Sequence, residues 1–508
     1  MAHVPLFSLL IAVPLLGVAL IALLPRRAEQ LAKPIALGAA LVVFSGTVAM
    51  WFGWRTDGPR FQYPESYTWI PQFGSAFTLG ADGIAAVMVA LVGVLVPIVV
   101  LASWHDAEPG KHSVRAFFAL VLVLESFMLG VFAATDVLVF YVFFEVMLVP
   151  MYFLISSYGG PRRQYAAVKF FLYSLVGGLL MLASVIGLYA ISSNQLGKGT
   201  FSFEALLSLH IDPVTQRWLF LGFFIAFAIK APLIPFHTWL PDASAQAPIG
   251  VSVLLVGALD KVGTYGMLRY CLPLFGSAAY DFAPWIIGLS VAGILYGAIL
   301  AVGQSDMKRL VAYTSIAHFG FIALGVFAFT AQAGTGAVLY MVNHGLSVGA
   351  LFLVVGFLIS RRNSSLISDF GGMARLMPWI AGVFLIAGLS ALSLPGTNSF
   401  ASEFLILIGA FGAHKAATIV ATVGIIFAAL FVLWLYQQTM HGPLIPELAV
   451  TDSPARLAVR DITRREVAVI SPLIGLILLL GVYPQPVIDV INPAVDRTLA
   501  DLHISSGR

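Results

Sequence analysis

The stretch that decides the fold reads AIKAPLIPFHTWLPDA and covers residues 228–243. A strongly apolar run precedes it, and Lys230 stands near the end of that run. Pro232 and Pro235 then remove two backbone donors in quick succession, which interrupts a helix. Broken helices inside a membrane are tolerated where they line a polar cavity, and they often mark transport sites. The stretch therefore predicts a broken membrane helix beside an ionisable group, the alternative being a kink that serves packing alone.

The composition excludes most soluble classes of protein. Of the 508 residues, 60% are hydrophobic and 10% are charged, and the mean hydropathy is +0.95. Soluble chains carry about a quarter charged residues, so lipid is the expected solvent. A net charge of +3 is too small to indicate a nucleic-acid partner.

Redox chemistry is not expected within this chain. The single cysteine, Cys271, cannot form an intrachain disulfide or ligate an iron–sulfur cluster alone. The sequence also has no Gly-rich nucleotide fingerprint. We therefore expect no cofactor-binding site here, and any linked redox chemistry is assigned to another chain.

Apolar runs long enough to cross ~30 Å of hydrocarbon recur along the chain. Arg26 and Arg27 follow the first run, an order that predicts a retained helix rather than a cleaved signal. The pattern predicts an all-α integral membrane fold with about 14 transmembrane helices. The expected spans are residues 5–24, 31–53, 80–103, 114–133, 136–157, 165–192, 216–237, 248–270, 283–303, 308–330, 333–359, 378–412, 416–440 and 467–484.

The positions of the basic residues predict the orientation. With the N-terminus outside, roughly twice as many lysines and arginines fall in the inside segments as in the outside ones, as the positive-inside rule requires. This bias supports an even number of helices and places both termini on the outer side. The long connections at 54–79 and 193–215 are then outside loops, and 441–466 is an inside loop.

Several charged residues fall within apolar runs. A charge at mid-bilayer costs on the order of 3 kcal/mol on insertion scales, so such groups face a protein interior or a water-filled cavity. One interpretation is a set of static ion pairs that fix helix packing. The number and mixture of acids and amines favour a path for ions instead. The residues concerned are Glu125, Glu145, Lys230, Lys261 and Glu403.

The run at 378–412 repeats the design of the first break. It is too long for one ordinary span, Pro395 and Gly396 interrupt it, and Glu403 follows. The two halves of the chain thus each hold a broken helix beside an ionisable group. Such a pair indicates two related repeats that enclose a transport route.

Three histidines lie within or at the ends of predicted helices, namely His237, His318 and His344. Histidine relays protons near neutral pH, but a lone buried histidine is as often a satisfied core residue. Both interpretations stay open for His318 and His344, and His237 is the weaker candidate. Their spacing does not indicate a metal site.

Three acids remain. Asp260 adjoins Lys261, but sequence neighbours do not face each other on a helix, so any charge compensation would come from a neighbouring face. Asp136 is expected to cap the fifth span. For Glu125 we favour an acid satisfied by its neighbours over a member of the ion path.

Four motifs resemble the antiporter-like membrane subunits of respiratory complex I. They are FEVMLVP at 144–150, KAPLIPFHTWLPDA at 230–243, KVGTYG at 261–266 and LPGTNSFASEF at 394–404. The likeness extends over nearly the whole chain. The fourth motif is similar to the branch of that family in which Glu403, rather than a lysine, follows the second break.

The resemblance implies a fold of fourteen helices with two inverted five-helix repeats, helices 4–8 and 9–13, in which helices 7 and 12 are broken. The corresponding divisions are 1–113, 114–271, 281–440 and 441–508. It also implies proton pumping across a bacterial inner membrane. The energy would come from partner subunits that hold NADH, FMN, iron–sulfur clusters and quinone. Other membrane subunits, including neighbouring antiporter-like ones, and membrane lipid are the expected partners.

The same resemblance implies roles for individual residues. Glu145 would pair with Lys230, Lys261 would connect the two halves, and Glu403 would end the path. His237, His318 and His344 would lie along the central axis. The chain departs from the family at Ser244, where histidine is common, and at Asp260, where the family is usually apolar.

Three other functions are compatible with much of this pattern. A subunit of a multisubunit cation/proton antiporter shares the fold but usually has lysine at the position of Glu403. A membrane-bound hydrogenase subunit would be distinguished by its soluble partners. A purely structural subunit would tolerate neutral substitutions at Lys230 and Lys261.

Overall fold

The computed structural model describes residues 5–107, 113–449 and 459–506. Within these ranges, twelve helical segments are long and apolar enough to cross a membrane. The chain is therefore an all-α integral membrane protein. The segments contain α1 (Leu6–Leu23), α2 (Ala32–Phe52), α3 (Gly83–Ala102), α4 (Val114–Ala133), α5 (Val137–Val146) with α6 (Leu148–Tyr158), α7 (Arg163–Leu196), α11 (Ile249–Leu254) to α13 (Leu272–Leu274), α14 (Gly276–Val302), α15 (Met307–Phe327), α16 (Ala331–Arg362), α19 (Lys415–Met440) and α22 (Arg464–Val482).

Both predicted breaks are present. The helix α9 (Pro213–Lys230) ends before the two prolines, and the chain resumes as α10 (Trp239–Gln246). The second long run divides into α17 (Pro378–Ala391) and α18 (Asn398–Ala413). The expected span 216–237 is too long at its end, because the residues from Ala231 onward leave the helix. Two short helices, α8 (Phe203–Leu207) and α20 (Pro446–Ala449), lie in connections.

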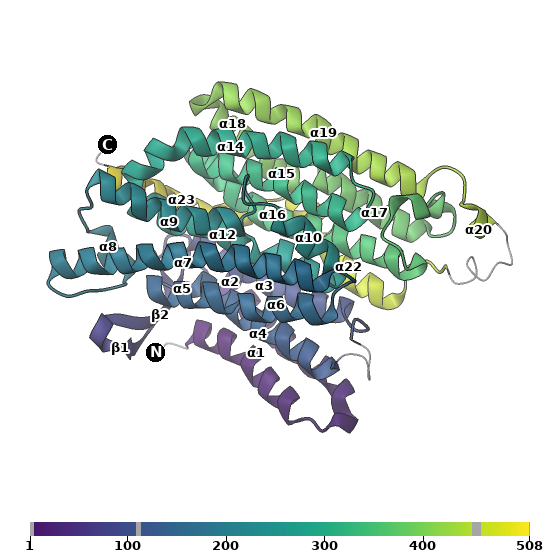
Figure 1. The fold of residues 1–508 in the computed structure, drawn as a ribbon, viewed down its shortest axis with the longest axis horizontal. Coiled ribbons are helices and arrows are strands. Elements are labelled where there is room, and N and C mark those ends of the chain that lie inside the picture. The colour runs from purple at the N-terminus through teal and green to yellow at the C-terminus, as the bar shows by residue number, and fades with distance from the viewer. Residues whose placement is uncertain (1–4, 108–112, 450–458, 507–508) are drawn as a thin grey trace.

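The long helices run roughly side by side along the longest axis of the molecule (Figure 1). In this view α1 lies on the lower edge and α19 on the upper edge, with α15 and α16 between them. The central helices α15 and α16 and the segment 249–274 are almost wholly buried inside the bundle. These helices form the interior of the bundle, so a polar path through the protein would be lined by their side chains.

A two-stranded antiparallel hairpin, β1 (Gln62–Ile70) and β2 (Ser75–Ala81), occupies the connection predicted as a plain loop at 54–79. It shortens the following helix, which begins at Gly83 with Asp82 as its cap rather than at residue 80. Glu65 of β1 accepts a hydrogen bond of 2.6 Å from the backbone N–H of Phe7. The hairpin thus supplies an anion to the open N-terminus of α1, where carboxylates are favoured.

The C-terminal segment forms the helix α23 (Gln485–Ser506), where we expected only a tail. Its apolar residues repeat with helical spacing and are buried, whereas its polar residues lie between them. It packs against α3, α13, α14 and α16. Arg60 forms an ion pair of 2.6 Å with Asp501, which fastens α23 to the hairpin connection.

Candidate functional site

Lys261 lies at the centre of the bundle, where two helical geometries meet. A π-helical turn, Leu255–Leu259, ends at Asp260, and the helix α12 (Lys261–Gly266) begins immediately afterwards. Lys261 Nζ lies 3.0 Å from Asp260 Oδ1, and neither side chain is exposed. The expectation that these neighbours do not face each other was wrong. A wider π turn changes the direction in which successive side chains leave the helix.

Lys261 also contacts the second half of the chain. Its Nζ lies 2.6 Å from Nδ1 of His344 on α16 and donates to the carbonyl of Val256. The ring of Phe319 on α15 lies 5.1 Å from the same ammonium. One buried amine is therefore held by a carboxylate, an imidazole, a carbonyl and an aromatic face, which together offset much of the cost of burying its charge.

A row of titratable side chains continues from His344 toward the second break. The rings of His344 and His318 have centroids 5.2 Å apart, and those of His318 and Tyr340 are 5.7 Å apart. The Tyr340 hydroxyl donates a hydrogen bond of 3.0 Å to Glu403 Oε2. The sequence of groups is therefore amine, two imidazoles, phenol and carboxyl, all buried. Such groups exchange protons when they hydrogen-bond directly or through one water.

Glu403 lies on α18, just past the second break. The hydroxyl of Ser393, in the interrupted segment, donates to the same Oε2 atom that accepts from Tyr340. Sequence reasoning missed both partners. Tyr340 was detectable in principle, because it precedes His344 by four residues and so shares its face of the helix.

A cluster of small polar side chains surrounds the second break. Asn398 Oδ1 accepts from Ser347 at 3.0 Å and from Ser390 at 2.6 Å. Asn343 Nδ2 donates to the Asn398 carbonyl at 2.7 Å and to Ser402 at 3.1 Å. These bonds satisfy buried polar side chains and join α16 and α17 to the start of α18.

Lys230 is the last residue of α9. The indole of Trp239 donates a hydrogen bond of 2.8 Å to the Ile229 carbonyl, one of the acceptors freed by the break. Lys230 itself is fully buried, and its Nζ has no hydrogen-bond partner in the described part of the chain. The rings of Phe144 and Phe170 lie 4.9 Å and 5.6 Å from that atom. It is a buried amine in an aromatic cage.

Glu145 is near the end of α5, beside Phe144. It is only partly buried, and its Oε1 has no hydrogen-bond partner among the described residues. The carboxylate lies against Gly178 of α7, so closely that a β-carbon built there would overlap it. The residues described include no ion pair between Glu145 and Lys230, although the resemblance implies that the two pair.

The first break packs against the helix that carries Lys261. A β-carbon built on Gly263 would lie 2.6 Å from the Ala231 nitrogen and 2.7 Å from its β-carbon. Only glycine permits this approach of α12 to the end of α9. Lys230 and Lys261 therefore belong to two elements in direct contact.

His237 stands apart from the central row. Its ring lies 5.1 Å from that of Tyr296 in an edge-to-face arrangement. Near it, Asp242 of α10 forms ion pairs with Lys169 at 2.8 Å and with Arg309 at 2.7 Å. Sequence reasoning did not find this triad, which fastens the segment after the break to α7 and α15.

The environment of Asp242 favours its charged form. Burial alone would raise the pKa of the carboxyl, but the hydrogen bonds and charges of Lys169 and Arg309 lower that pKa below its ordinary value. Ser244, the departure from the family pattern, donates to the Leu240 carbonyl at 2.6 Å and is satisfied within its own helix.

The two remaining acids behave differently. Asp136 caps α5 as predicted, because its carboxylate accepts from the backbone N–H groups of Leu138 and Val139. Glu125 on α4 is fully buried, and neither of its carboxyl oxygens has a hydrogen-bond partner among the described residues. The interpretation of Glu125 as an acid satisfied by its neighbours was therefore wrong.

Comparison with known proteins identifies the family of the chain. The family model described as the transmembrane region of NADH:quinone oxidoreductase and the Mrp antiporter matches residues 134–428. A curated relative from Mycobacterium tuberculosis, named NADH-quinone oxidoreductase subunit M, is 44% identical and covers 99% of this chain and 95% of its own.

Two solved structures have the same fold. A chain of respiratory complex I from Thermus thermophilus superposes with a TM-score of 0.86 at 30% identity and covers 98% of this chain and 99% of its own. A chain of the Mrp complex from Dietzia superposes with a TM-score of 0.80 at 23% identity and covers 96% of this chain and 52% of its own. The chain therefore belongs to the NADH:quinone oxidoreductase/Mrp antiporter family, and within it to the group of NADH-quinone oxidoreductase subunit M.

Proposed function

We propose that this chain is the proton-translocating membrane subunit M of an NADH-quinone oxidoreductase, respiratory complex I. Partner subunits would transfer electrons from NADH to quinone, and this chain would use the released energy to move protons. The observation that carries the proposal is the buried row that runs from Lys261 through His344, His318 and Tyr340 to Glu403. A static packing device would not need titratable groups at every step.

Lys230 is the proposed switch. Its ammonium lies in an aromatic cage without a carboxylate at ion-pair distance, so approach of Glu145 would favour the charged amine and withdrawal would release its proton. Moving a proton against ~150 mV requires roughly 3.5 kcal/mol. An ion pair at ~4 Å in an effective dielectric of 20 is worth ~4 kcal/mol. Making and breaking this one contact therefore supplies energy of the required size.

The proposed route passes from Lys230 to Lys261 across the contact of α9 with α12. It continues along the histidines and Tyr340 to Glu403. Lys261 first releases its proton toward His344 and, as the neutral amine, accepts the next one from Lys230, while Asp260 stabilises the charged form that results. His237 lies beside the first break and would serve proton entry there, with the other histidines as relays.

The finer architecture is also part of the proposal. The twelve candidate spans, together with α9 and the divided pair α17 and α18, support fourteen crossings. Helices 4–8 and 9–13 would form two inverted repeats within 114–271 and 281–440, flanked by 1–113 and 441–508. Both ends of the described chain lie toward the same end of the bundle (Figure 1), which supports an even number of crossings. The bias of basic residues is the ground for proposing that this end is the outer side of a bacterial inner membrane.

The expected partners follow from this assignment. Neighbouring antiporter-like subunits and other membrane subunits would surround the chain in the lipid bilayer. The soluble partners would hold NADH, FMN and iron–sulfur clusters, and quinone would react in partner subunits. The test is purification of the intact complex with this chain tagged, followed by mass-spectrometric identification of the subunits that accompany it.

Pumping is tested in the same complex reconstituted in vesicles. Lys230→Ala and Glu145→Ala should abolish proton uptake and slow quinone reduction, whereas Glu145→Asp should be milder because it keeps the charge. A normal ratio of protons to electrons in either alanine variant would refute the proposal. Sodium-dependent transport would instead indicate the cation/proton antiporter function.

A further inference from the structure

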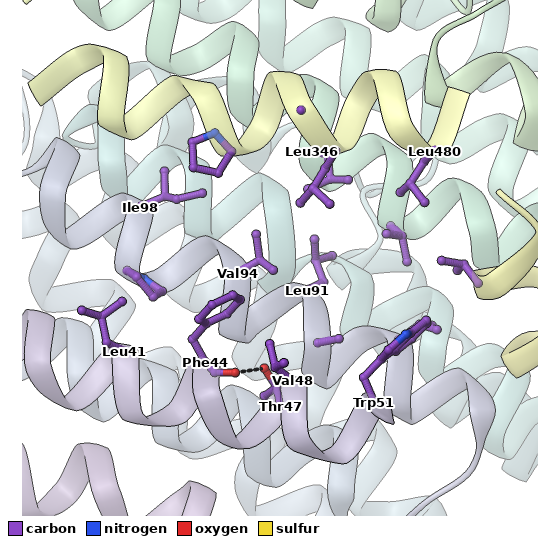
Figure 2. Close-up of a pocket in the computed structure, with 18 of the residues that line it drawn as sticks. Leu41, Phe44, Thr47, Val48, Trp51, Leu91, Val94, Ile98, Leu346 and Leu480 are labelled. Carbon is purple, nitrogen blue, oxygen red and sulfur yellow. Dashed lines mark hydrogen bonds between the residues drawn. The ribbon is translucent and has the colours of Figure 1, made fainter. Parts of the chain in front are cut away.

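A long apolar groove lies between α2, α3 and α22, outside the polar row (Figure 2). Its volume is about 760 Å³, within the range of ligand pockets in general. Figure 2 shows Leu41, Phe44 and Trp51 on one wall and Leu346 and Leu480 on the opposite one. The hydroxyl of Thr47 does not make the groove polar, because it donates to the Phe44 carbonyl at 2.8 Å.

The groove has the length of a lipid chain. Along α3 its lining runs from Val87 to Leu101, which at 1.5 Å per residue is ~21 Å. One leaflet of the hydrocarbon core is ~15 Å deep. Leu41, Val48 and Phe52 are exposed along the α2 side, so the groove opens on the outer surface of the bundle.

Narrow, flexible acyl chains fit the length and the apolar lining of this groove. A transmembrane helix of another subunit is the alternative occupant, and the second test below distinguishes the two.

One end of the groove is cationic. Lys33 is two helical turns from Leu41 on the same face of α2, and Arg465 is one turn from Ala468 on α22. Trp104 follows Leu101 by three residues, and its ring lies 5.9 Å from Lys33 Nζ. The groove therefore leads toward two cations and an indole, the side chains that anchor phospholipid headgroups.

Arg465 acts on Lys33 as a like charge, while two acids at this end, Glu29 near Lys33 and Asp106 near Arg465, offset part of the positive charge. Arg465 Nη1 also lies 3.0 Å from Nδ1 of His105. An anion between Lys33 and Arg465 would remove the repulsion and bind to both. The same end carries Arg26, Arg27 and Arg464, which add to the positive potential there.

We propose that this groove binds the acyl chains of an anionic glycerophospholipid whose phosphate lies between Lys33 and Arg465. The lipid fills a gap between α2, at the edge of the bundle, and the buried α3. It does not depend on the proton path, since none of the groove residues belongs to that row.

The first test replaces the cations in the intact complex. The complex is equilibrated in nanodiscs with equal amounts of phosphatidylglycerol and phosphatidylcholine and re-extracted, and the retained lipid is counted by mass spectrometry. Lys33→Gln and Arg465→Gln should each weaken retention of phosphatidylglycerol about fivefold. Lys415→Gln, at the start of α19, is the matched control and should retain it. Equal retention by wild type and the double variant would overturn the proposal.

The second test fills the groove. A β-carbon built on Gly475 of α22 meets no atom within 4 Å, so Gly475→Leu extends into the empty groove without a clash. It should displace the lipid while the complex still assembles. Gly382→Leu on α17, where a β-carbon also meets nothing, is the control. An electron-microscopy map with a protein helix in the groove, or unchanged lipid retention in Gly475→Leu, would contradict the proposal.

Discussion

Tyr340 and Glu403 are joined by a hydrogen bond of 3.0 Å that links α16 to α18 across the second break. Through this bond the phenol of Tyr340 connects the histidines on one side with the carboxyl of Glu403 on the other. The Tyr340 ring in turn lies 5.7 Å from the His318 ring, measured between centroids.

Replacing Tyr340 with phenylalanine should interrupt that row without emptying the space. Hydrogen bonds to charged groups are worth ~1.5–3 kcal/mol, so we expect proton pumping to fall about tenfold or more. The measurement is proton uptake per electron in reconstituted vesicles. Tyr436→Phe, on α19, is the matched control and should pump normally. Full pumping by Tyr340→Phe would exclude the hydroxyl from the path.

Asp260 and Lys261 should behave as a buried charge pair. Removing one partner of such a pair costs ~3–5 kcal/mol, whereas removing both is often close to neutral. Asp260→Ala should therefore lower the thermal stability of the complex more than Asp260→Ala with Lys261→Ala. Both variants should lose pumping. A double variant that is less stable than either single one would show that the two groups do not compensate each other.

A substitution at Gly178 tests whether pumping depends on the position of the Glu145 carboxylate, because it changes no charge. A methyl group there overlaps the carboxylate, so Gly178→Ala should displace Glu145 and reduce pumping while assembly continues. In Gly187→Ala, on the same helix, the new methyl meets only the end of the flexible Leu219 side chain, and pumping should be unchanged. Equal pumping in the two variants would show that proton pumping does not depend on the present position of the Glu145 carboxylate.

The Asp242 triad should stabilise the protein in a pH-dependent way. Because the folded-state pKa of Asp242 is lowered, its contribution is present above the unfolded value of ~3.9 and is lost as the pH falls below it. The difference in thermal stability between wild type and Asp242→Asn should thus be largest near neutral pH and shrink below about pH 4. Asp281→Asn, which removes the more exposed Arg217 pair, should have a smaller effect. A difference in thermal stability between wild type and Asp242→Asn that increased at acidic pH would contradict a stabilising role for the charged Asp242.

The apolar runs predicted most of the long helices, because a membrane span needs only length and low polarity, both visible in the sequence. The breaks were also visible, since proline removes a donor wherever it stands. The hairpin at 62–81 and the helix α23 were not predicted. Glu65 and Asp501 each bind a residue that is distant in the sequence, and such contacts leave no local pattern. The helix α23 is also amphipathic and contains Pro493, so it has no long apolar run.

The candidate site was visible in the sequence as separate charged residues, but the row of neighbouring side chains that the structure places between them was not. Lys230, Lys261 and Glu403 stand out because they are charged in apolar surroundings. Tyr340 and Ser393 do not, because phenols and hydroxyls are common in membrane helices. The contact of Asp260 with Lys261 required the π-helical turn, which follows from packing in the bundle rather than from local propensity.

The contact of α23 with α3 has a consequence for biosynthesis. The helix α3 leaves the ribosome about four hundred residues before α23, so this face of α3 stays uncovered during most of translation. A message truncated shortly before codon 485 would therefore yield a product whose α3 lacks this cover, an exposed seam that membrane proteases recognise.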